Sequence, residues 1–167
     1  MDFFRFIADS LHLIAIFMLI FRIQKTRNCI GLSYRTQEIF LVSLSLRYLD
    51  LFIYYVSLYN TAMKVLYLGA TCYTIYLMRK KRPYCGTYDA AMDEFPHYMF
   101  IYPGVFILTL IVHSKFTFVE FLWSYSLWLE AVAFIPQIIV LNKMGTVENL
   151  TSHYVGALGC YRFFYIL

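Results

Sequence analysis

The segment Leu44–Phe52 places an arginine, a phenol and a carboxylate inside an otherwise apolar stretch, as Arg47, Tyr48 and Asp50. A charged side chain at the centre of a membrane helix costs about 3 kcal/mol on insertion scales, so such a residue usually faces a cavity and a partner. A second arginine, Arg162, lies in a similar stretch near the other end of the chain. Two buried cations at matching depth require something anionic between them, and this requirement constrains any fold of the chain.

Composition indicates the class of protein. Of the 167 residues, 61% are hydrophobic and only 14% are charged, whereas a soluble domain averages about half apolar and about a quarter charged. The net charge of +4 is too small and too scattered for a nucleic-acid surface, so no nucleic acid is expected as a partner. The four cysteines have no CxxC or metal-ligand spacing and predict neither a disulfide framework nor a metal site.

Six segments are apolar enough to cross a bilayer, which takes roughly 20 residues of helix. They are Phe4–Phe21, Gln37–Leu58, Ala62–Met78, His97–His113, Phe118–Leu141 and Ser152–Leu167. Asp2, Arg5 and Asp9 lie among the first residues and no small-residue cleavage site follows, so we expect a retained helix and not a signal peptide. Because the connections are too short for a soluble domain, the chain is predicted to be an all-α multi-pass membrane protein with one transmembrane domain over residues 1–167.

The distribution of basic residues predicts an orientation. The odd-numbered connections contain Arg22, Lys25, Arg27, Arg35, Arg79, Lys80, Lys81, Arg82 and Lys143, whereas the other side has only Arg5, Lys64 and Lys115. The positive-inside rule therefore places the odd connections in the cytosol and the N-terminus in the lumen or exterior. The run Arg79–Arg82 is interpreted as an anchor of this kind, with a lipid or coat contact as the alternative. The sequon Asn149–Thr151 would then be cytosolic and unmodified.

A weak internal repeat relates the two halves of the chain. An alignment that brings Arg47 onto Arg162 also places His12 on Glu130, and the helix directions agree, which predicts a parallel repeat. The first three-helix repeat covers about residues 4–78, a connector helix covers about 97–113, and an incomplete second repeat covers about 118–167. On this interpretation six helices are present and a seventh is missing.

Four of the spans contain ionisable side chains that cannot plausibly face lipid: Arg5, Asp9, His12, Arg47, Asp50, Glu120, Glu130 and Arg162. At about 1.5 Å per residue, His12, Arg47 and Glu130 lie near the midplane or in its lumenal half, while Arg5 and Glu120 lie closer to the lumenal mouth. We therefore expect a water-filled pocket that opens to the lumen and is positive at its floor. Its ligand would contain a carboxylate, because arginine can bind one bidentately.

Each of these residues also has a purely structural explanation. Arg47 can pair with Asp50 three residues later, and Glu130 with Arg162 can be a tie between two helices. His12 can be a hydrogen-bonded structural residue. Its unperturbed pKa near 6.5 nevertheless makes it a candidate pH switch.

The aromatic candidates are also open to two interpretations. Trp123 fits an interface belt as well as a pocket wall. The tyrosines near the arginines are more often packing residues, although the first two have a possible hydrogen-bonding role: Tyr48, Tyr161 and Tyr165.

No catalytic constellation stands out. The four histidines are distributed over different helices, and no GxSxG, HExxH or phosphate loop occurs in the sequence. Glu120 and Glu130 are ten residues apart, which puts them on different helix faces. Neither an enzyme nor a cofactor or metal is therefore predicted.

Several motifs resemble one family in order and over essentially the whole chain. They are Ser10–Leu13, Lys25–Gly31, Arg47–Phe52, Ser57–Val65, Leu122–Trp123, Leu129–Glu130, Pro136–Gln137, His153–Tyr154 and Leu158–Arg162. The chain is similar to the ER lumen protein-retaining (K-D-E-L) receptor family. The resemblance implies a multi-pass receptor of the endoplasmic reticulum and Golgi membranes that binds the C-terminal signal of escaped ER residents and returns them, aided by cytosolic coat machinery. Binding would be favoured at acidic Golgi pH and lost at neutral ER pH.

By position, the resemblance implies where the signal binds. Arg47 and Tyr48 would hold its terminal carboxylate, and Arg5 an acidic side chain. Glu120 would meet the basic residue at the start of the signal, with Trp123 as its gate.

The resemblance also implies a pH sensor. His12 would take up the proton, coupled to Glu130 and Tyr161, with Arg162 and Tyr165 in the same polar layer. Protonation adds positive charge near a carboxylate ligand, so binding should tighten as pH falls, by at most about 1.4 kcal/mol per proton and pH unit. Asp50 would be a local partner that orients the helix or the arginine.

The chain departs from the family in two places. The family continues beyond the position of Leu167 through an Asn-Trp pair, a further arginine, a seventh helix and a lysine-bearing tail, so we expect an incomplete or truncated chain. The connection Lys80–Pro96 is longer and more basic than is usual. Two other hypotheses are a small two-repeat transporter of a carboxylate-bearing solute and a structural membrane subunit. Pro136–Gln137 is compatible with a receptor or a transporter, because such a proline can open a helix.

Overall fold

The computed structural model describes residues 3–49, 57–112, 117–145 and 149–166, with the side chains of 3–5, 149–150 and 165–166 excepted. Within these residues the chain forms only helices, which confirms the predicted all-α class: α1 (Phe3–Thr26), α2 (Tyr34–Arg47), α3 (Leu58–Arg79), α4 (His97–Ile111), α5 (Phe118–Val132), α6 (Ile135–Met144) and α7 (Asn149–Ile166). A short 3₁₀ helix, Tyr84–Thr87, lies in the connection between α3 and α4.

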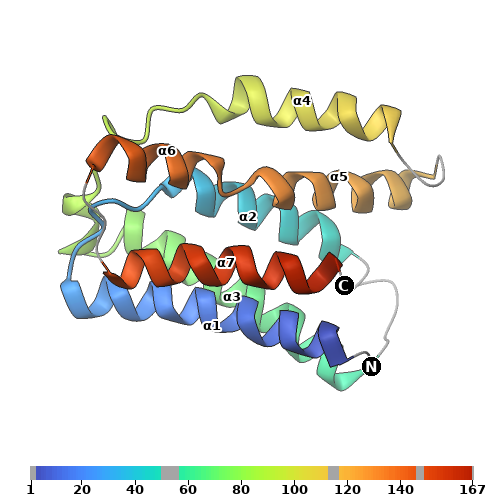
Figure 1. Ribbon diagram of the computed structural model, residues 1–167, viewed down its shortest axis with the longest axis horizontal. Coiled ribbons are helices and arrows are strands. Elements are labelled where there is room, and N and C mark those ends of the chain that lie inside the picture. The colour runs from blue at the N-terminus through green and yellow to red at the C-terminus, as the bar shows by residue number, and fades with distance from the viewer. Residues whose placement is uncertain (1–2, 50–56, 113–116, 146–148, 167) are drawn as a thin grey trace.

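The helices lie side by side along one long axis (Figure 1). The most extensive contacts are between α1 and α7 and between α2 and α5, and α4 packs on α5. The shared core is apolar and includes Leu19, Ile39, Leu77 and Leu129. The outer faces are apolar as well, for example at Ile107 on α4. An apolar exterior is what a lipid environment requires.

Two helical stretches of the described chain are long and apolar enough to cross a membrane, Phe6–Thr26 and Phe118–Met144. The helix His97–Ile111 is a shorter apolar one. The predicted spans and the observed helices agree to within a few residues at most ends. The first helix continues beyond its predicted end at Phe21 to Thr26. The second half of the span Gln37–Leu58 and the end of His97–His113 lie largely outside the described residues.

The predicted span Phe118–Leu141 lies within the apolar stretch Phe118–Met144, which the chain forms as two consecutive helices, α5 and α6. Pro136 lacks an N–H group and its ring would clash with the carbonyl of Val132, so α5 ends there. Helix α6 restarts with Pro136 in its first turn. The backbone N–H of Gln137 donates instead to Thr36 Oγ1 of α2, at 3.0 Å. The break therefore ties α6 to α2.

The connection between α1 and α2 fits closely under the end of α6. Gly31 has a φ of +77°, and a Cβ atom there would lie 2.6 Å from Met144 Sδ. Glycine suits both the positive φ and the close approach. The side chain of Gln137 donates to the carbonyl of Gly31 at 2.8 Å and accepts from the N–H of Ser33 at 2.9 Å.

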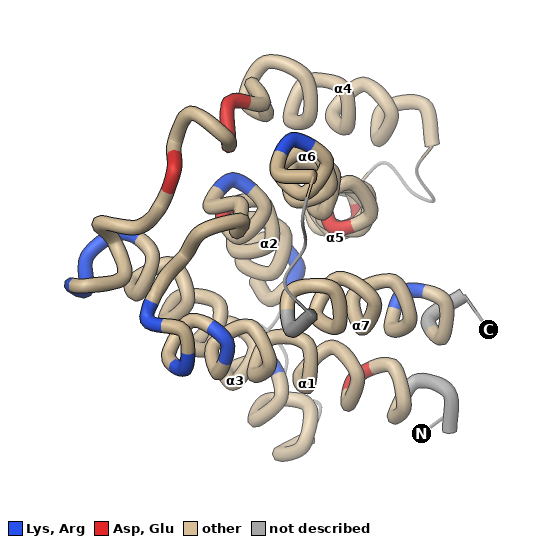
Figure 2. The backbone as a smooth tube through the Cα atoms, turned by 60° about the vertical axis from the view of Figure 1, so that its left-hand side comes forward, with Lys and Arg blue, Asp and Glu red and all other residues tan. Residues whose placement is uncertain are grey.

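We call the end of the bundle that contains Lys25, Arg27, Arg79–Arg82 and Lys143 the basic end. Figure 2 has this end turned forward and shows Lys and Arg gathered at the connections after α1 and α3. Arg22 differs from its predicted place in a connection, because it lies inside α1 and is buried. Its guanidinium donates to the carbonyls of Asn28 and Ile30, so it closes the helix end. It is therefore a structural residue and not a juxtamembrane charge.

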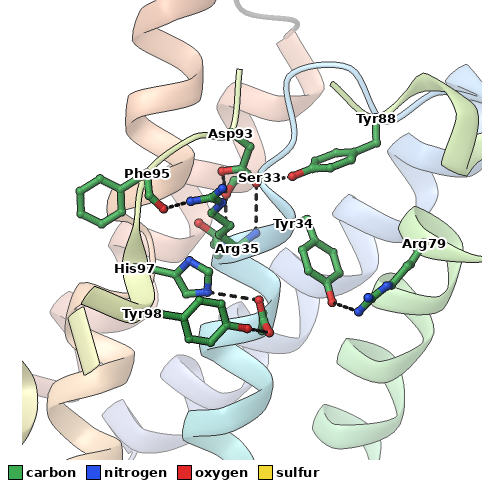
Figure 3. A network of polar contacts seen from close by, with 11 residues as sticks. Ser33, Tyr34, Arg35, Arg79, Tyr88, Asp93, Phe95, His97 and Tyr98 are labelled. Atoms are coloured by element: carbon green, nitrogen blue, oxygen red, sulfur yellow. Dashed lines mark hydrogen bonds and ion pairs between the residues drawn. The ribbon is translucent and has the colours of Figure 1, made fainter. Parts of the chain in front are cut away.

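The long connection 80–96 is fastened to the start of α2 by Asp93 (Figure 3). This buried carboxylate accepts from Ser33 Oγ at 2.8 Å, from the N–H of Arg35 at 3.1 Å and from the Tyr88 hydroxyl at 2.7 Å. Burial and the hydrogen bond to Asp93 raise the pKa of Tyr88 above its usual value. In the connection before α2, burial raises the pKa of the Cys29 thiol to about 11.

A second contact of this end joins α2 to α4. His97 Nε2 lies 3.2 Å from Glu38 Oε2, and the hydroxyl of Tyr98 donates to the same carboxylate (Figure 3). Arg35 donates to the carbonyl of Phe95. The connection and the first turn of α4 are therefore held on α2 by polar contacts.

Candidate functional site

Three helices bring their charges together in the interior. Arg47, the last residue of α2, forms an ion pair with Glu130 of α5. Arg162 of α7 approaches the same oxygen, with 3.4 Å between its Nη2 and Glu130 Oε2. The glutamate side chain is 1% exposed, and the arginines are 18% and 24% exposed. The anion that the two arginines require is therefore Glu130.

The other oxygen of this carboxylate is also engaged. The hydroxyl of Tyr161 donates to Glu130 Oε1 at 3.0 Å. Arg162 lies over the Tyr161 ring, 5.5 Å from its centroid. Glu130 and Tyr161 are therefore joined by a hydrogen bond between α5 and α7.

Within the part of the chain that the structure describes, the centre has more positive than negative charge. Two guanidinium groups share one carboxylate, and each guanidinium has five N–H donors. Among the described residues, buried nitrogens of Arg47 (Nη2) and Arg162 (Nε and Nη2) have no hydrogen-bond partner, although both Nη2 atoms are near the glutamate. Because both arginine side chains are partly exposed, their remaining N–H groups can donate to a second carboxylate, and Arg–carboxylate pairs are strong and directional.

His12 of α1 lies beside this centre, with an aromatic ring on each face. Its ring stacks on Tyr161 at a centroid distance of 4.3 Å and an interplanar angle of 6°. On the other face Tyr67 of α3 lies at 4.8 Å and 22°. His12 is buried, and the sequence did not indicate its contact with Tyr67.

On the far side of Arg47, α2 and α3 contribute further polar groups. Tyr48 forms the C-cap of α2 and is buried, and the Lys64 ammonium lies 5.6 Å from its ring centroid. Arg47 Nε lies 3.5 Å from Ser126 Oγ, which in turn donates to the carbonyl of Trp123 at 2.6 Å. Tyr48 therefore caps the end of α2 with its backbone and contacts the Lys64 ammonium with its ring.

Glu120 and Trp123 lie one turn apart on α5. Glu120 is half-buried in the first turn, and Trp123 is exposed. At about 1.5 Å per residue, Trp123 lies about 10 Å along the helix from Glu130. Glu120 and Trp123 therefore lie between the charged centre and the end of the bundle that is opposite the basic end.

Three predicted residues fall outside what the structure describes. Asp50 is not among the described residues, and the side chains of Arg5 and Tyr165 are not described, although their backbones belong to α1 and α7. The proposed pairing of Arg47 with Asp50 stays a prediction. The tie between Glu130 and Arg162, which the sequence left as an alternative, is present.

Three residues of the site were missed by the sequence analysis: Lys64, Tyr67 and Ser126. A signal for the first two exists, because Lys64, Tyr67, Thr71 and Thr74 are all buried on α3. Their spacing of three, four and three residues puts one polar stripe on one helix face. No comparable pattern marks Ser126. In the described part of the chain, no group of three His, Cys, Asp or Glu side chains could hold a metal ion.

The fold and the site together define a helical membrane protein with a buried, positively charged centre between its helices. A family model described as ER lumen protein retaining receptor matches residues 28–167. An ER lumen protein-retaining receptor of Plasmodium falciparum is 45% identical over all 167 residues, which cover 76% of that protein. Those of Drosophila melanogaster (44%) and Arabidopsis thaliana (receptor B, 41%) also match the whole chain, which covers 77% of each.

The chain belongs to the ER lumen protein-retaining receptor family, a family of multi-pass membrane receptors. The family resemblance predicted from the motifs is therefore confirmed. The relatives are named as receptors, and the transporter hypothesis has no support from them.

Proposed function

We propose that the chain is a retrieval receptor, which binds the C-terminal signal of escaped ER-resident proteins in the Golgi and returns them to the ER. Membership of the family, whose members are named for retaining proteins of the ER lumen, supports this function. The same membership argues for a receptor and against an enzyme. It also supports a location in the ER and Golgi membranes.

One observation carries the proposal at the level of chemistry. Arg47 and Arg162 converge on the buried carboxylate of Glu130, which among these three described residues leaves one positive charge in excess. A peptide's terminal carboxylate neutralises that excess and can use the remaining guanidinium donors. A low dielectric around the site strengthens the attraction between the guanidinium groups and such a carboxylate. The signal is therefore recognised through its free carboxylate.

The contacts of the signal follow from this placement. Arg47 and Tyr48 bind the terminal carboxylate, and Arg5 binds an acidic side chain. The basic residue at the start of the signal meets Glu120, which lies about ten residues along α5 from Glu130. Trp123, exposed next to Glu120, acts as the gate.

The remaining predicted residues support the charged centre. Arg162 and Tyr165 form its polar layer, and Asp50 orients Arg47. The repeats over residues 4–78 and 118–167, joined by the connector helix, place the two arginines at equivalent depth.

The pH dependence is assigned to His12. Its ring lies against Tyr161, whose hydroxyl donates to Glu130. A proton on the imidazole therefore adds a positive charge next to the charged centre. Protonation adds a positive charge beside a carboxylate ligand. Affinity therefore rises as pH falls, by at most about tenfold per pH unit for one proton. The receptor loads at acidic Golgi pH and releases at neutral ER pH.

The orientation completes the proposal. The basic end faces the cytosol, where membrane lipid and coat machinery are the partners, and the N-terminus faces the lumen. Arg47 then lies at the lumenal end of α2.

Binding of a short peptide that ends in Lys-Asp-Glu-Leu tests the function. The purified protein is titrated with the free-acid and the C-terminally amidated peptide, each at pH 5.5 and pH 7.4. We expect measurable affinity only for the free acid, and tighter binding at the lower pH. Equal binding of the two peptides would exclude carboxylate recognition by Arg47, and equal binding at the two pH values would exclude the proton switch.

A further inference from the structure

The described contacts of His12 include a second aromatic face that the signal site does not use. Tyr161 covers one face of the imidazole and belongs to the charged centre through its bond to Glu130. Tyr67 covers the other face, with 4.8 Å between ring centroids and an interplanar angle of 22°. The imidazole is therefore enclosed between two phenol rings, contributed by α7 and α3.

Tyr67 is held firmly in this position. Its side chain is buried, and its hydroxyl donates to the backbone carbonyl of Asp9 at 2.7 Å. Asp9 lies one turn before His12 on α1, so the hydrogen bond fixes α3 against α1 at the level of the histidine. A side chain so anchored keeps its ring against the imidazole.

A proton on His12 meets a mixed electrostatic environment. From α2 and α7, the guanidinium groups of Arg47 and Arg162 oppose a further positive charge, and from α5 the carboxylate of Glu130 favours it. Among the described side chains, the other charged groups near this level are Lys64 on α3 and Asp9 on α1 itself. Because cations outnumber anions among these described groups, the imidazolium benefits from a stabilising group that adds no net charge. The face of a phenol ring is such a group, because its π electrons attract a cation.

We propose that Tyr67 is a positioning residue that sets the pH of the switch, by holding its ring face against the His12 imidazolium. The inference rests on the proposed function, in which protonated His12 favours signal binding. It adds a residue from α3 to a switch otherwise made by α1, α5 and α7. Removing electron density from the Tyr67 ring makes protonation less favourable and moves the midpoint of binding to lower pH.

The two features of Tyr67 can be separated by experiment. Tyr67→Phe removes only the hydroxyl and its bond to Asp9, and keeps the ring. Replacing that phenylalanine by its mono-, di- and trifluorinated analogues keeps the shape but weakens the π face stepwise. Because the side chain stays nearly isosteric, the variants test the ring without a cavity in the core. The same series at Tyr161 would be less informative, since Tyr161 also bonds Glu130.

The measurement is the pH midpoint of binding for the free-acid peptide, taken between pH 5 and 8. We expect Tyr67→Phe to keep the midpoint within a few tenths of a unit, and the trifluorinated analogue to lower it by about 0.5 to 1 unit. The same series at Tyr73 is the matched control. Tyr73 lies on the same helix, is exposed and stacks on Tyr76 with 6.4 Å between ring centroids, so its midpoint should not move.

The outcomes distinguish this inference from the proposed function. If the unmodified receptor binds the peptide with the expected pH dependence and the midpoint is the same across the Tyr67 series, the role of Tyr67 is overturned. If the unmodified receptor binds no peptide, the proposed function fails. The titration of isotopically labelled histidine, assigned to His12 with His12→Gln, then still tests Tyr67 without peptide. A stepwise shift of that titration supports the role, and an unchanged one overturns it.

Discussion

Glu130→Gln is the most direct perturbation of the charged centre. The change removes one negative charge and keeps the shape, and the amide oxygen can still accept the hydrogen bond from Tyr161. It leaves Arg47 and Arg162 facing each other with no carboxylate between them. The protein without ligand should therefore lose stability, while its affinity for an anionic ligand should not be lost.

The magnitude follows from the burial of the three side chains. Removing one partner of a buried ion pair costs about 3 to 5 kcal/mol. The arginines are 18% and 24% exposed, and water reaching them reduces the penalty, so the lower end of about 3 kcal/mol is expected. For a chain of this size a change of 1 kcal/mol shifts Tm by about 2 to 4 °C, which gives a fall of about 6 to 12 °C.

Thermal unfolding in detergent, with and without the free-acid peptide, measures this effect. Glu94→Gln is the matched control, because Glu94 pairs with Lys143 at 3.3 Å but its side chain is 68% exposed. Such a surface pair contributes about 0 to 1 kcal/mol. At acidic pH the peptide should raise the Tm of Glu130→Gln more than that of the unmodified protein, since its carboxylate replaces the missing charge. A fall in Tm no larger than that of Glu94→Gln would refute the role of Glu130 as the shared counter-ion.

Four further predictions concern the switch, the helix break, the reactivity of Cys29 and the orientation. His12→Ala should abolish the acid dependence of peptide binding, and a pH profile that keeps its slope would remove His12 as the sensor. Gln137→Leu leaves the buried N–H of Ser33 unpaired and frees the carbonyl of Gly31, which should lower the free energy of unfolding by about 2 to 4 kcal/mol. Chemical denaturation measures that loss. Because burial raises the pKa of Cys29 to about 11, Cys29 should react with a maleimide at pH 7.5 more slowly than the half-buried Cys85. In cells whose plasma membrane alone is permeabilised, labelling of Cys85 by an impermeant maleimide is expected, and protection of Cys85 would contradict a cytosolic basic end.

The sequence was sufficient for the class and the outline of the fold. Apolar segments separated by basic connections predicted the helices, because a bilayer fixes both the length and the composition of a spanning helix. The cost of burying Arg47 and Arg162 predicted that they share an anion. Both inferences depend on whether the surrounding solvent is lipid or water, and the amino-acid composition of a segment indicates which of the two surrounds it.

Tertiary structure decided which groups meet. The packing of α2 on α5 brings Arg47 to Glu130, and Arg162 approaches the same carboxylate from α7. Tyr67 reaches His12 because α3 lies against α1, and no spacing along the chain encodes the angle between those rings. Pro136 in the sequence indicates the break before α6. The hydrogen bond from the N–H of Gln137 to Thr36 could not be predicted from it. The sequence determined which residues are too costly to leave without partners, because that depends on each side chain and its solvent. The tertiary structure determined which partners they have, because that depends on distances between helices far apart in the chain.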